Sequence, residues 1–292
     1  MTYSALLLVI AAAVAHATWN LLNKKAAHVG PAFVFAYGFC STVIYLPWVL
    51  WILIVDEPSW SVPVVLCILL SGLLHLVYSL CLQRGYQLAD LSVVYPVARG
   101  TGPLLSTIGA LLFMSEPASI RGISGMLCVV LGVMLIATQG QITRLLTPTA
   151  IVGVRWGILV GTLIAAYTLV DAYGVKTLAI APVLFDWATC VTKTIMMFPH
   201  VARNPKQARE AVKGYWHLAW AIGLLSPLGY ILVLYALRNG APVSLVAPAR
   251  EMSMLLVTLA GLYFLREAVG WGRVAGCCAI AAGVVLLSGA GG

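Results

Sequence analysis

The sequence has very little charge, and above all little negative charge. Charged side chains make up 9% of the 292 residues, and nine acidic residues face 17 lysines and arginines. Hydrophobic residues account for 62%, and the mean hydropathy is +1.00. Because a soluble domain carries about 25% charged residues, this composition excludes one and indicates a chain embedded in a lipid bilayer.

Motifs that mark pumps and enzymes are also missing. Without a G-x-x-x-x-G-K-[ST] loop, transport must draw on a gradient or be passive. Without G-x-S-x-G or H-E-x-x-H, an intramembrane enzyme is a weak alternative. The seven cysteines lie in apolar runs and form no C-x-x-C pair, so we expect no disulfide framework, no metal site and no cofactor.

What the sequence does contain is ten apolar runs of roughly 20 residues, each long enough to cross the hydrocarbon core as a helix. Backbone groups in lipid must be satisfied internally, which favours helices over open strands. No room remains for a soluble catalytic domain. The predicted spans are 3–23, 31–54, 62–83, 91–113, 119–139, 153–173, 181–199, 215–237, 243–264 and 269–289.

The two halves of the chain repeat one another. Landmark residues recur 151 positions later (171 − 20 = 151), and we divide the chain into repeats 1–140 and 153–292 with a linker at 141–152. The matching pairs are Asn20 and Asp171, Lys25 and Lys176, Pro31 and Pro182, Glu116 and Glu267, Gly125 and Gly276, and Gly132 and Gly283. Five spans is an odd number, so the second repeat is inverted. The sequence thus predicts an all-α integral membrane fold of ten transmembrane helices, in two inverted five-helix repeats around a central cavity, as in secondary transporters.

The basic residues report orientation, and we expect no nucleic-acid partner despite the net charge of +8. Eleven of the 17 lie in loops after odd-numbered spans, which predicts both termini on the outer face of the cell (inner) membrane. These eleven are Lys24, Lys25, Arg84, Arg144, Arg155, Arg203, Lys206, Arg209, Lys213, Arg266 and Arg273. Ala15-His16-Ala17 resembles a signal-peptide cleavage site, but no basic residue precedes the apolar run, so we expect the first span to be retained.

Ionisable residues inside spans are the leading functional candidates, because a charge at the bilayer centre usually faces a cavity or a partner. Arg99 lies within 91–113, and Arg250 and Glu251 lie within 243–264, each just after a proline. We expect these segments to approach the pseudo-two-fold axis. Either Arg99 pairs with Glu251, as a static link or otherwise, or each charge faces a hydrated cavity.

A polar stripe in the first span supports the same cavity. His16 and Asn20 are four residues apart on one helical face, and their repeat counterparts are Tyr167 and Asp171. His16 is either a proton carrier or a hydrogen-bonded packing residue. Asp171 is either a cavity residue or an interfacial carboxylate near the end of its span.

Aromatic residues complete the predicted pocket. Trp19, His75, Tyr78, Tyr95 and Tyr230 offer apolar walls with polar anchors, although aromatic residues also gather at membrane interfaces. The candidate substrate-binding residues are therefore His16, Trp19, Asn20, His75, Tyr78, Tyr95, Arg99, Tyr167, Asp171, Tyr230, Arg250 and Glu251.

Two further features receive structural interpretations. Asp186 and Lys193 are seven residues apart and could share one helical face, but Lys193 can also extend to the nearby interface, which is the interpretation we favour. The small residues repeated in 119–139 and 269–289 indicate close helix packing or dimerisation.

The paired five-span repeats, the prolines Pro96 and Pro248, the span-closing Glu116 and Glu267, and the opening 15-AHATWN-20 resemble the drug/metabolite transporter superfamily, in particular its EamA-type members. The resemblance covers essentially the whole chain. It implies a ten-helix fold with a cavity bounded mainly by the first, third, fourth, sixth, eighth and ninth spans. The aromatic residues suggest the aromatic amino-acid exporter branch.

The first expectation is therefore a monomeric or homodimeric secondary transporter that exports small metabolites, most of all aromatic or other neutral amino acids. The alternative is a transporter of drugs, nucleotide sugars or lipid-linked sugars, or a flippase, of the same fold. An intramembrane enzyme is the remaining class.

Overall fold

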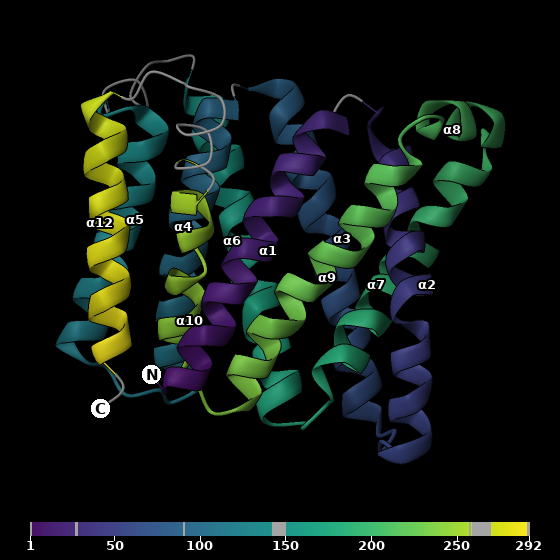
Figure 1. Ribbon diagram of the computed structural model, residues 1–292, viewed down its shortest axis with the longest axis horizontal. Coiled ribbons are helices and arrows are strands. Elements are labelled where there is room, and N and C mark those ends of the chain that lie inside the picture. The colour runs from purple at the N-terminus through teal and green to yellow at the C-terminus, as the bar shows by residue number, and fades with distance from the viewer. Residues whose placement is uncertain are drawn as a thin grey trace.

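The chain folds into a bundle of helices that stand side by side (Figure 1). The computed structural model describes residues 2–26, 29–89, 91–141, 150–256, 258 and 270–290, and these contain helices but no strand. The helices are α1 (Tyr3–Ala26), α2 (Pro31–Val55), α3 (Val62–Leu88), α4 (Leu91–Phe113), α5 (Ile120–Thr138), α6 (Ala150–Lys176), α7 (Pro182–Ala202), α8 (Pro205–Val212), α9 (Trp216–Arg238), α10 (Val243–Ala249) and α12 (Trp271–Gly289).

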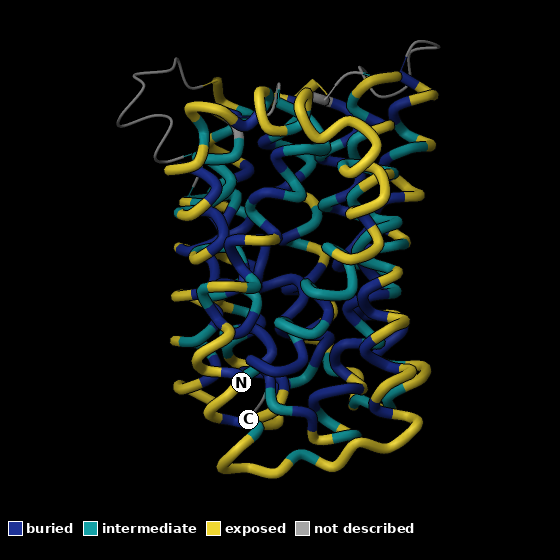
Figure 2. Tube along the Cα trace, turned by 90° about the vertical axis from the view of Figure 1, so that its right-hand side faces the viewer, coloured by how far each residue is buried: buried dark blue, intermediate teal, exposed yellow. Residues whose placement is uncertain are grey.

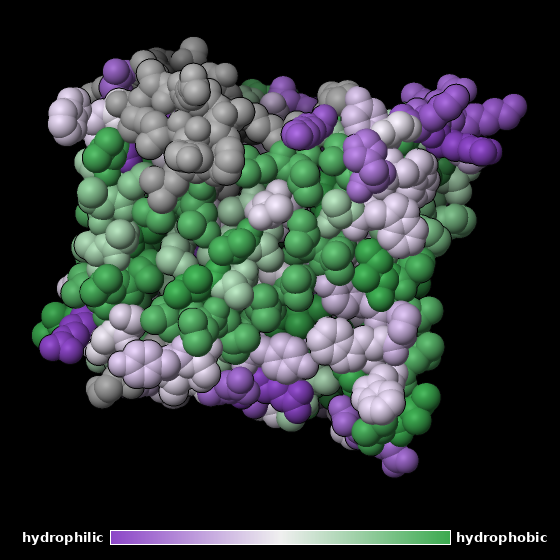
Figure 3. All heavy atoms as spheres, in the orientation of Figure 1, coloured by the Kyte–Doolittle hydropathy of each residue, from purple (hydrophilic) through white to green (hydrophobic). Residues whose placement is uncertain are grey.

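The all-α membrane fold expected from the sequence is confirmed. Seven of the described helices, α1, α2, α3, α5, α6, α9 and α12, are long and apolar enough to cross a membrane. Hydrophobic residues form a band across the molecule between two more hydrophilic ends (Figure 3). Helices α4 and α7 are less apolar because they carry charges, such as Arg99 and Lys193, whereas α8 and α10 are too short to cross a membrane.

The two repeats run in opposite directions. The same buried cluster contains Val9 and Ala12 from the first half of α1 and Ala172 and Val175 from the last turns of α6, so these two counterpart helices point in opposite directions. We call the end where α1 begins and α12 ends the terminal end, and the opposite one the far end (Figure 1). Buried residues gather along the inside of the bundle, and exposed residues cover its outside (Figure 2).

The glycines of the fifth and tenth spans allow two helices to touch. A Cβ on Gly132 would lie 2.7 Å from the carbonyl oxygen of Gly276, and one on Gly125 would lie 2.9 Å from that of Gly283. Only a residue without a Cβ permits this approach of α5 and α12, so the glycine spacing serves packing inside the chain.

The ninth span is not one continuous helix as predicted over 243–264. Helix α10 ends at Ala249, a turn follows at Arg250 and Glu251, and helix resumes at 252–256. Pro248 has no N–H to donate to the carbonyl of Ser244, so one helical hydrogen bond is missing. Three residues later, Glu251 N–H donates to Pro248 O at 3.0 Å, which is the bond of a tighter turn. The break places both charged residues at a point where the backbone leaves the helix. Residues 257 and 259–269, which include Glu267, lie outside the described part of the chain.

The segment 200–214, expected to be a loop, contains the short helix α8. Pro205 occupies its first turn, where a missing N–H costs nothing, and Val212 is buried against the bundle. The charged residues of α8 face outward, so the helix is amphipathic and lies at the far end (Figure 1).

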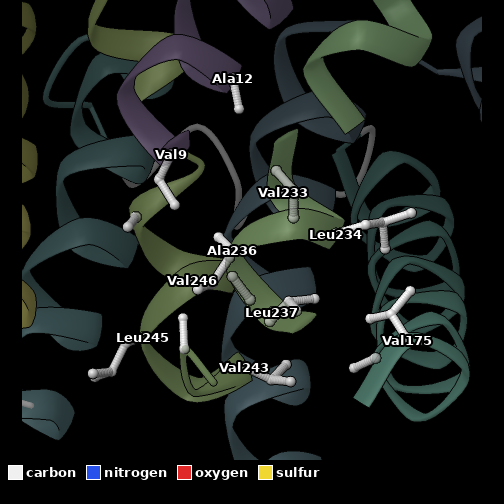
Figure 4. Packing of buried hydrophobic residues seen from close by; sticks show 14 of the residues in the cluster. Val9, Ala12, Val175, Val233, Leu234, Ala236, Leu237, Val243, Leu245 and Val246 are labelled. Atoms are coloured by element: carbon white, nitrogen blue, oxygen red, sulfur yellow. The ribbon is translucent and has the colours of Figure 1, made fainter. Parts of the chain in front are cut away.

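A layer of small and branched side chains closes the bundle toward the terminal end (Figure 4). We call this layer the apolar seal. It draws side chains from α1, α6, α9 and α10, each no more than 5% exposed. Its members are Val9, Ala12, Val175, Val233, Leu234, Ala236, Leu237, Val243, Leu245 and Val246.

Candidate substrate-binding cavity

A central cavity of about 240 Å³ lies on the far side of the apolar seal. Its walls come from α1, α2, α3, α4, α6, α7 and α9 and from the turn after α10. The lining residues are His16, Trp19, Asn20, Asn23, Tyr37, Ser41, His75, Tyr78, Ser79, Leu82, Tyr86, Tyr95, Arg99, Ile164, Tyr167, Asp186, Thr189, Cys190, Lys193, Ser226, Pro227, Tyr230 and Arg250.

Most candidate residues from the sequence meet at this cavity. Ten of the twelve line it: His16, Trp19, Asn20, His75, Tyr78, Tyr95, Arg99, Tyr167, Tyr230 and Arg250. The other two, Asp171 and Glu251, lie directly behind the lining, where they bond to lining residues. The structure thus brings all twelve into one region.

Arg99 forms an ion pair with Glu251 and also lines the cavity, so the two roles considered for it, pairing and facing the cavity, are both present. Its Nη1 donates to both carboxylate oxygens of Glu251, at 3.1 and 3.2 Å. Glu251 is 1% exposed, and the Arg99 guanidinium also lies 5.3 Å from the ring centre of Tyr95. The pair neutralises one buried charge with another, and it joins α4 to the turn after α10.

Arg250 is the repeat counterpart of Arg99, but no carboxylate of the described residues neutralises its charge as Glu251 neutralises that of Arg99. Its side chain lines the cavity and is buried, yet Nε has no hydrogen-bond partner among the described residues. None of the described carboxylates lies within ion-pair distance of it. Because an unsatisfied buried donor costs free energy, a guanidinium in this setting favours an anionic ligand.

Asp171 is a fully buried member of a polar network and not an interfacial carboxylate. Ser71 Oγ donates to its Oδ1 at 2.5 Å, and the Tyr230 hydroxyl donates to its Oδ2. His75 Nε2 lies 3.7 Å from Oδ2, and Thr189 Oγ1 donates to Ser71. The carboxylate therefore holds the cavity-lining ring of Tyr230 directly and lies close to that of His75.

Aromatic rings form a continuous wall beside this network. His75 stacks on Tyr167 with ring centres 4.1 Å apart, and Tyr78 and Tyr230 meet the same ring edge-on at 5.5 and 6.2 Å. Such edge-on and offset contacts are the geometry that aromatic pairs prefer. The wall presents both apolar faces and hydroxyl groups to the cavity.

On α1, His16 lines the cavity and has one ring nitrogen held by a hydrogen bond. Trp19 Nε1 donates to His16 Nδ1 at 3.3 Å, and Asn20 Nδ2 donates to the His16 carbonyl at 2.7 Å. A Cβ on Gly229 would lie 2.5 Å from Nδ1, so this glycine is required for the imidazole to lie against α9. Nδ1 is therefore an acceptor, and the proton of the neutral ring is on Nε2.

The sequence analysis missed the contribution of α2 and α7. Tyr37, Asp186 and Lys193 line the cavity, and Lys193 Nζ lies 5.8 Å from the ring centre of Tyr37. The expectation that Lys193 reaches the interface was wrong, because the face of α7 that bears it turns inward. The seven-residue spacing of Asp186 and Lys193 carried this signal, since it puts both on one helical face.

A carboxylate closes the terminal end beneath the apolar seal. Glu116, between α4 and α5, accepts hydrogen bonds from the N–H groups of Val243 at 2.6 Å and Ser244 at 2.9 Å. Ser244 Oγ at 2.7 Å and Lys176 Nζ at 3.2 Å also donate to it. Burial raises the pKa of Glu116, but these hydrogen bonds and the lysine charge outweigh it and hold the pKa below its ordinary value. Glu116 thus caps α10 and ties together α4, α6 and α10.

Comparison with known proteins agrees with this architecture. The model of the EamA-like transporter family matches residues 3–138 and 151–289, one match for each repeat. A protein of known crystal structure superposes with a TM-score of 0.74 at 17% identity, over 98% of this chain and 96% of its own. At that identity the likeness shows the fold alone. No curated protein is significantly similar in sequence.

Proposed function

The chain belongs to the EamA-like transporter family, and on that premise we propose that it exports small amino acids or similar metabolites across the cell membrane. Membership makes it a multi-pass membrane transporter of the drug/metabolite type. The proposal adds the substrate class, the direction and the mechanism, which is secondary transport by alternating access at the central cavity.

The observation that carries the proposal is the buried Nε of Arg250 in the cavity wall, which has no hydrogen-bond partner among the described residues. A substrate carboxylate would satisfy its Nε with a charge-assisted hydrogen bond, which is about twice as strong as a neutral one. Arg99 does not compete for this role, because Glu251 already neutralises it.

The rest of the lining suits an amino acid. Asp186 offers a carboxylate for an α-ammonium group, and the rings of Tyr78, Tyr167 and Tyr230 offer an apolar wall for a side chain. A cavity of about 240 Å³ is slightly smaller than the usual range of about 300–1,000 Å³ for small-molecule sites, which favours a compact substrate over a sugar nucleotide.

The inverted repeats supply the mechanism. The cavity is sealed toward the terminal end by the apolar seal and Glu116, while its lining extends toward the far end through Asn23, Tyr86 and Tyr95. If the two repeats exchanged their conformations, the terminal end of the cavity would open and the far end would close. If the terminal end lies outside, as the basic residues predict, this exchange exports the substrate.

The test is uptake of labelled amino acids into liposomes that contain purified protein, with and without an imposed pH gradient. We expect saturable uptake, and a loss of about tenfold or more in Arg250→Gln, since a hydrogen bond to a charged group contributes about 1.5–3 kcal/mol. Arg155→Gln is the matched control, because it removes an exposed charge from α6 outside the cavity lining. The pH-gradient arm decides whether transport is coupled to protons.

Two results would overturn the proposal. Equal uptake by Arg250→Gln and wild type would show that Arg250 does not bind the substrate carboxylate. Absence of amino-acid uptake, together with saturable uptake of a sugar phosphate, would favour the alternative class, which the cationic lining residues Lys193 and Arg250 also suit.

A further inference from the structure

A second concave surface lies outside the central cavity, on the lipid-facing side of α2 and α7 beneath α8. This groove has a volume of about 810 Å³, larger than the central cavity. Its walls are α2, α7, α8 and the first residue of α9. The lining residues are Ala32, Phe35, Ala36, Phe39, Thr194, Ile195, Phe198, Val201, Ala202, Pro205, Ala208, Arg209, Val212 and Trp216.

The groove is apolar along its length and charged at one point. Phe35 and Phe198 face each other with ring centres 6.4 Å apart, and Phe198 is 59% exposed. Phe39 and Trp216 are also partly exposed. Of the lining residues, Arg209 alone carries a charge, and it comes from α8 at the far-end rim.

The rim above the groove is basic. Lys206 and Arg209 on α8, with Arg203 and Lys213 on either side, are all exposed, and Glu210 is the single acidic residue of the segment. None of these four cations forms an ion pair with a carboxylate in the described part of the chain. Hydrophilic residues project at this corner above aromatic and hydrophobic ones (upper right in Figure 3).

We propose that this groove binds an anionic phospholipid, with an acyl chain along α2 and α7 and the headgroup phosphate at Arg209 and Lys206. The apolar length fits a hydrocarbon chain, and the unpaired cations at its rim complement a phosphate. Basic clusters beside transmembrane helices attract anionic lipids in this way. Because the groove is separate from the central cavity, the proposal holds whatever the protein transports.

Another apolar groove on the same molecule provides an internal comparison. Residues of α3, α6 and the end of α4, including Leu66, Phe113 and Tyr173, line a groove of about 480 Å³ that contains no lysine or arginine. Ordinary lipid would fill either groove. Only the groove under α8 has the charge to prefer an anionic headgroup.

The experiment counts lipids bound to the detergent-purified full-length protein by native mass spectrometry. Dioleoyl phosphatidylglycerol and dioleoyl phosphatidylcholine, which share their chains and differ in headgroup charge, are titrated separately. We expect tighter binding of phosphatidylglycerol, and a preference reduced about 25-fold in Lys206→Gln/Arg209→Gln, at about fivefold for each basic residue. Arg155→Gln, an exposed charge of α6 outside the groove, should leave the preference unchanged.

Two further arms separate the parts of the site. Ala202→Phe places a ring in the groove and should weaken binding of both lipids alike, because it acts on the chain. Added salt should weaken only phosphatidylglycerol binding to the wild type, a readout that needs no variant to fold.

Wild-type preference in the double variant, or equal binding of the two lipids to the wild type, would overturn the proposal. A dimer whose mass shows no bound lipid, and which Ala202→Phe dissociates, would also overturn it by assigning the groove to a second copy of the chain.

Discussion

The interior of the bundle has two regions that are built from the same helices: a polar half around the cavity and an apolar half at the apolar seal. Helix α1 presents His16 and Asn20 to the cavity but Val9 and Ala12 to the seal. Helix α9 changes in the same way, from Tyr230 to Leu234 one turn later. The division between polar and apolar surroundings therefore runs along each helix.

The two halves are stabilised by different interactions. The polar half depends on pairing, since Arg99 with Glu251 and Asp171 with Ser71 and Tyr230 each satisfy buried charge. The apolar half depends on close packing, in which every lost methylene leaves a void. Substitutions in the two halves should therefore fail by different mechanisms.

The largest effect is expected where the polar half loses one partner of a buried pair. Glu251→Gln leaves the Arg99 guanidinium buried without a counter-charge, which should lower the free energy of unfolding by about 4 kcal/mol. Denaturant unfolding in micelles measures the loss. Arg99→Gln/Glu251→Gln removes both charges and should recover most of the stability, and a double variant as unstable as the single one would contradict the account.

A slightly smaller loss is expected in the apolar half. Leu234 is fully buried in the seal, so Leu234→Ala should cost about 3 kcal/mol through lost burial and the cavity left behind. Leu224→Ala is the matched control on the same helix, because Leu224 is 46% exposed. Equal losses for the two variants would show that the seal is not a packed layer.

A third variant tests the contact of α5 with α12, which lies outside both halves. In Gly132→Ala the new Cβ would lie 2.7 Å from the Gly276 carbonyl oxygen, and separating the helices should cost about 2 kcal/mol. Gly289→Ala meets no atom closer than 3.9 Å and should be neutral or slightly stabilising. A neutral Gly132→Ala would mean that the two helices do not pack as described.

The smallest effect is expected at the helix cap that closes the terminal end. Glu116→Gln replaces charged acceptors of the α10 N–H groups with a neutral amide and should cost about 1–2 kcal/mol at neutral pH.

The effect of Glu116 should also depend on pH. Its folded-state pKa is lower than the ordinary value, so its stabilisation is present above the unfolded pKa of about 4.3 and is lost as pH falls through the folded value. Unfolding curves of wild type and Glu116→Gln should therefore converge below that pH. A difference that persists in acid would contradict the role of the charge.

The sequence predicted the fold and most of the cavity because both depend on long-range regularities of the chain. Span length predicts ten transmembrane helices, and the recurrence of Asn20 at Asp171 and of Glu116 at Glu267 divides them into two inverted five-helix repeats. The rarity of charge in a bilayer likewise marked Arg99, Arg250 and Glu251 as residues with a partner or a cavity.

The features that were missed depend on local packing. Lys193 lies near a span end, which favoured the interfacial interpretation, and only the rotation of α7 shows that it faces the cavity. The break after Ala249 follows from Pro248, yet α4 continues through Pro96 and Pro103, so proline alone does not predict it. Helix α8 is too short for span length to reveal it.

The most direct test of the central claim is competition for the cavity by an amino acid and by its amide. Binding of a labelled, transported amino acid to purified protein is displaced by each competitor, in wild type and in Arg250→Gln. The account predicts that the carboxylate form competes about tenfold or more better than the amide in wild type, and that this preference disappears in Arg250→Gln. Equal competition by the amide in wild type, or an unchanged preference in the variant, would contradict the claim that Arg250 anchors the substrate carboxylate.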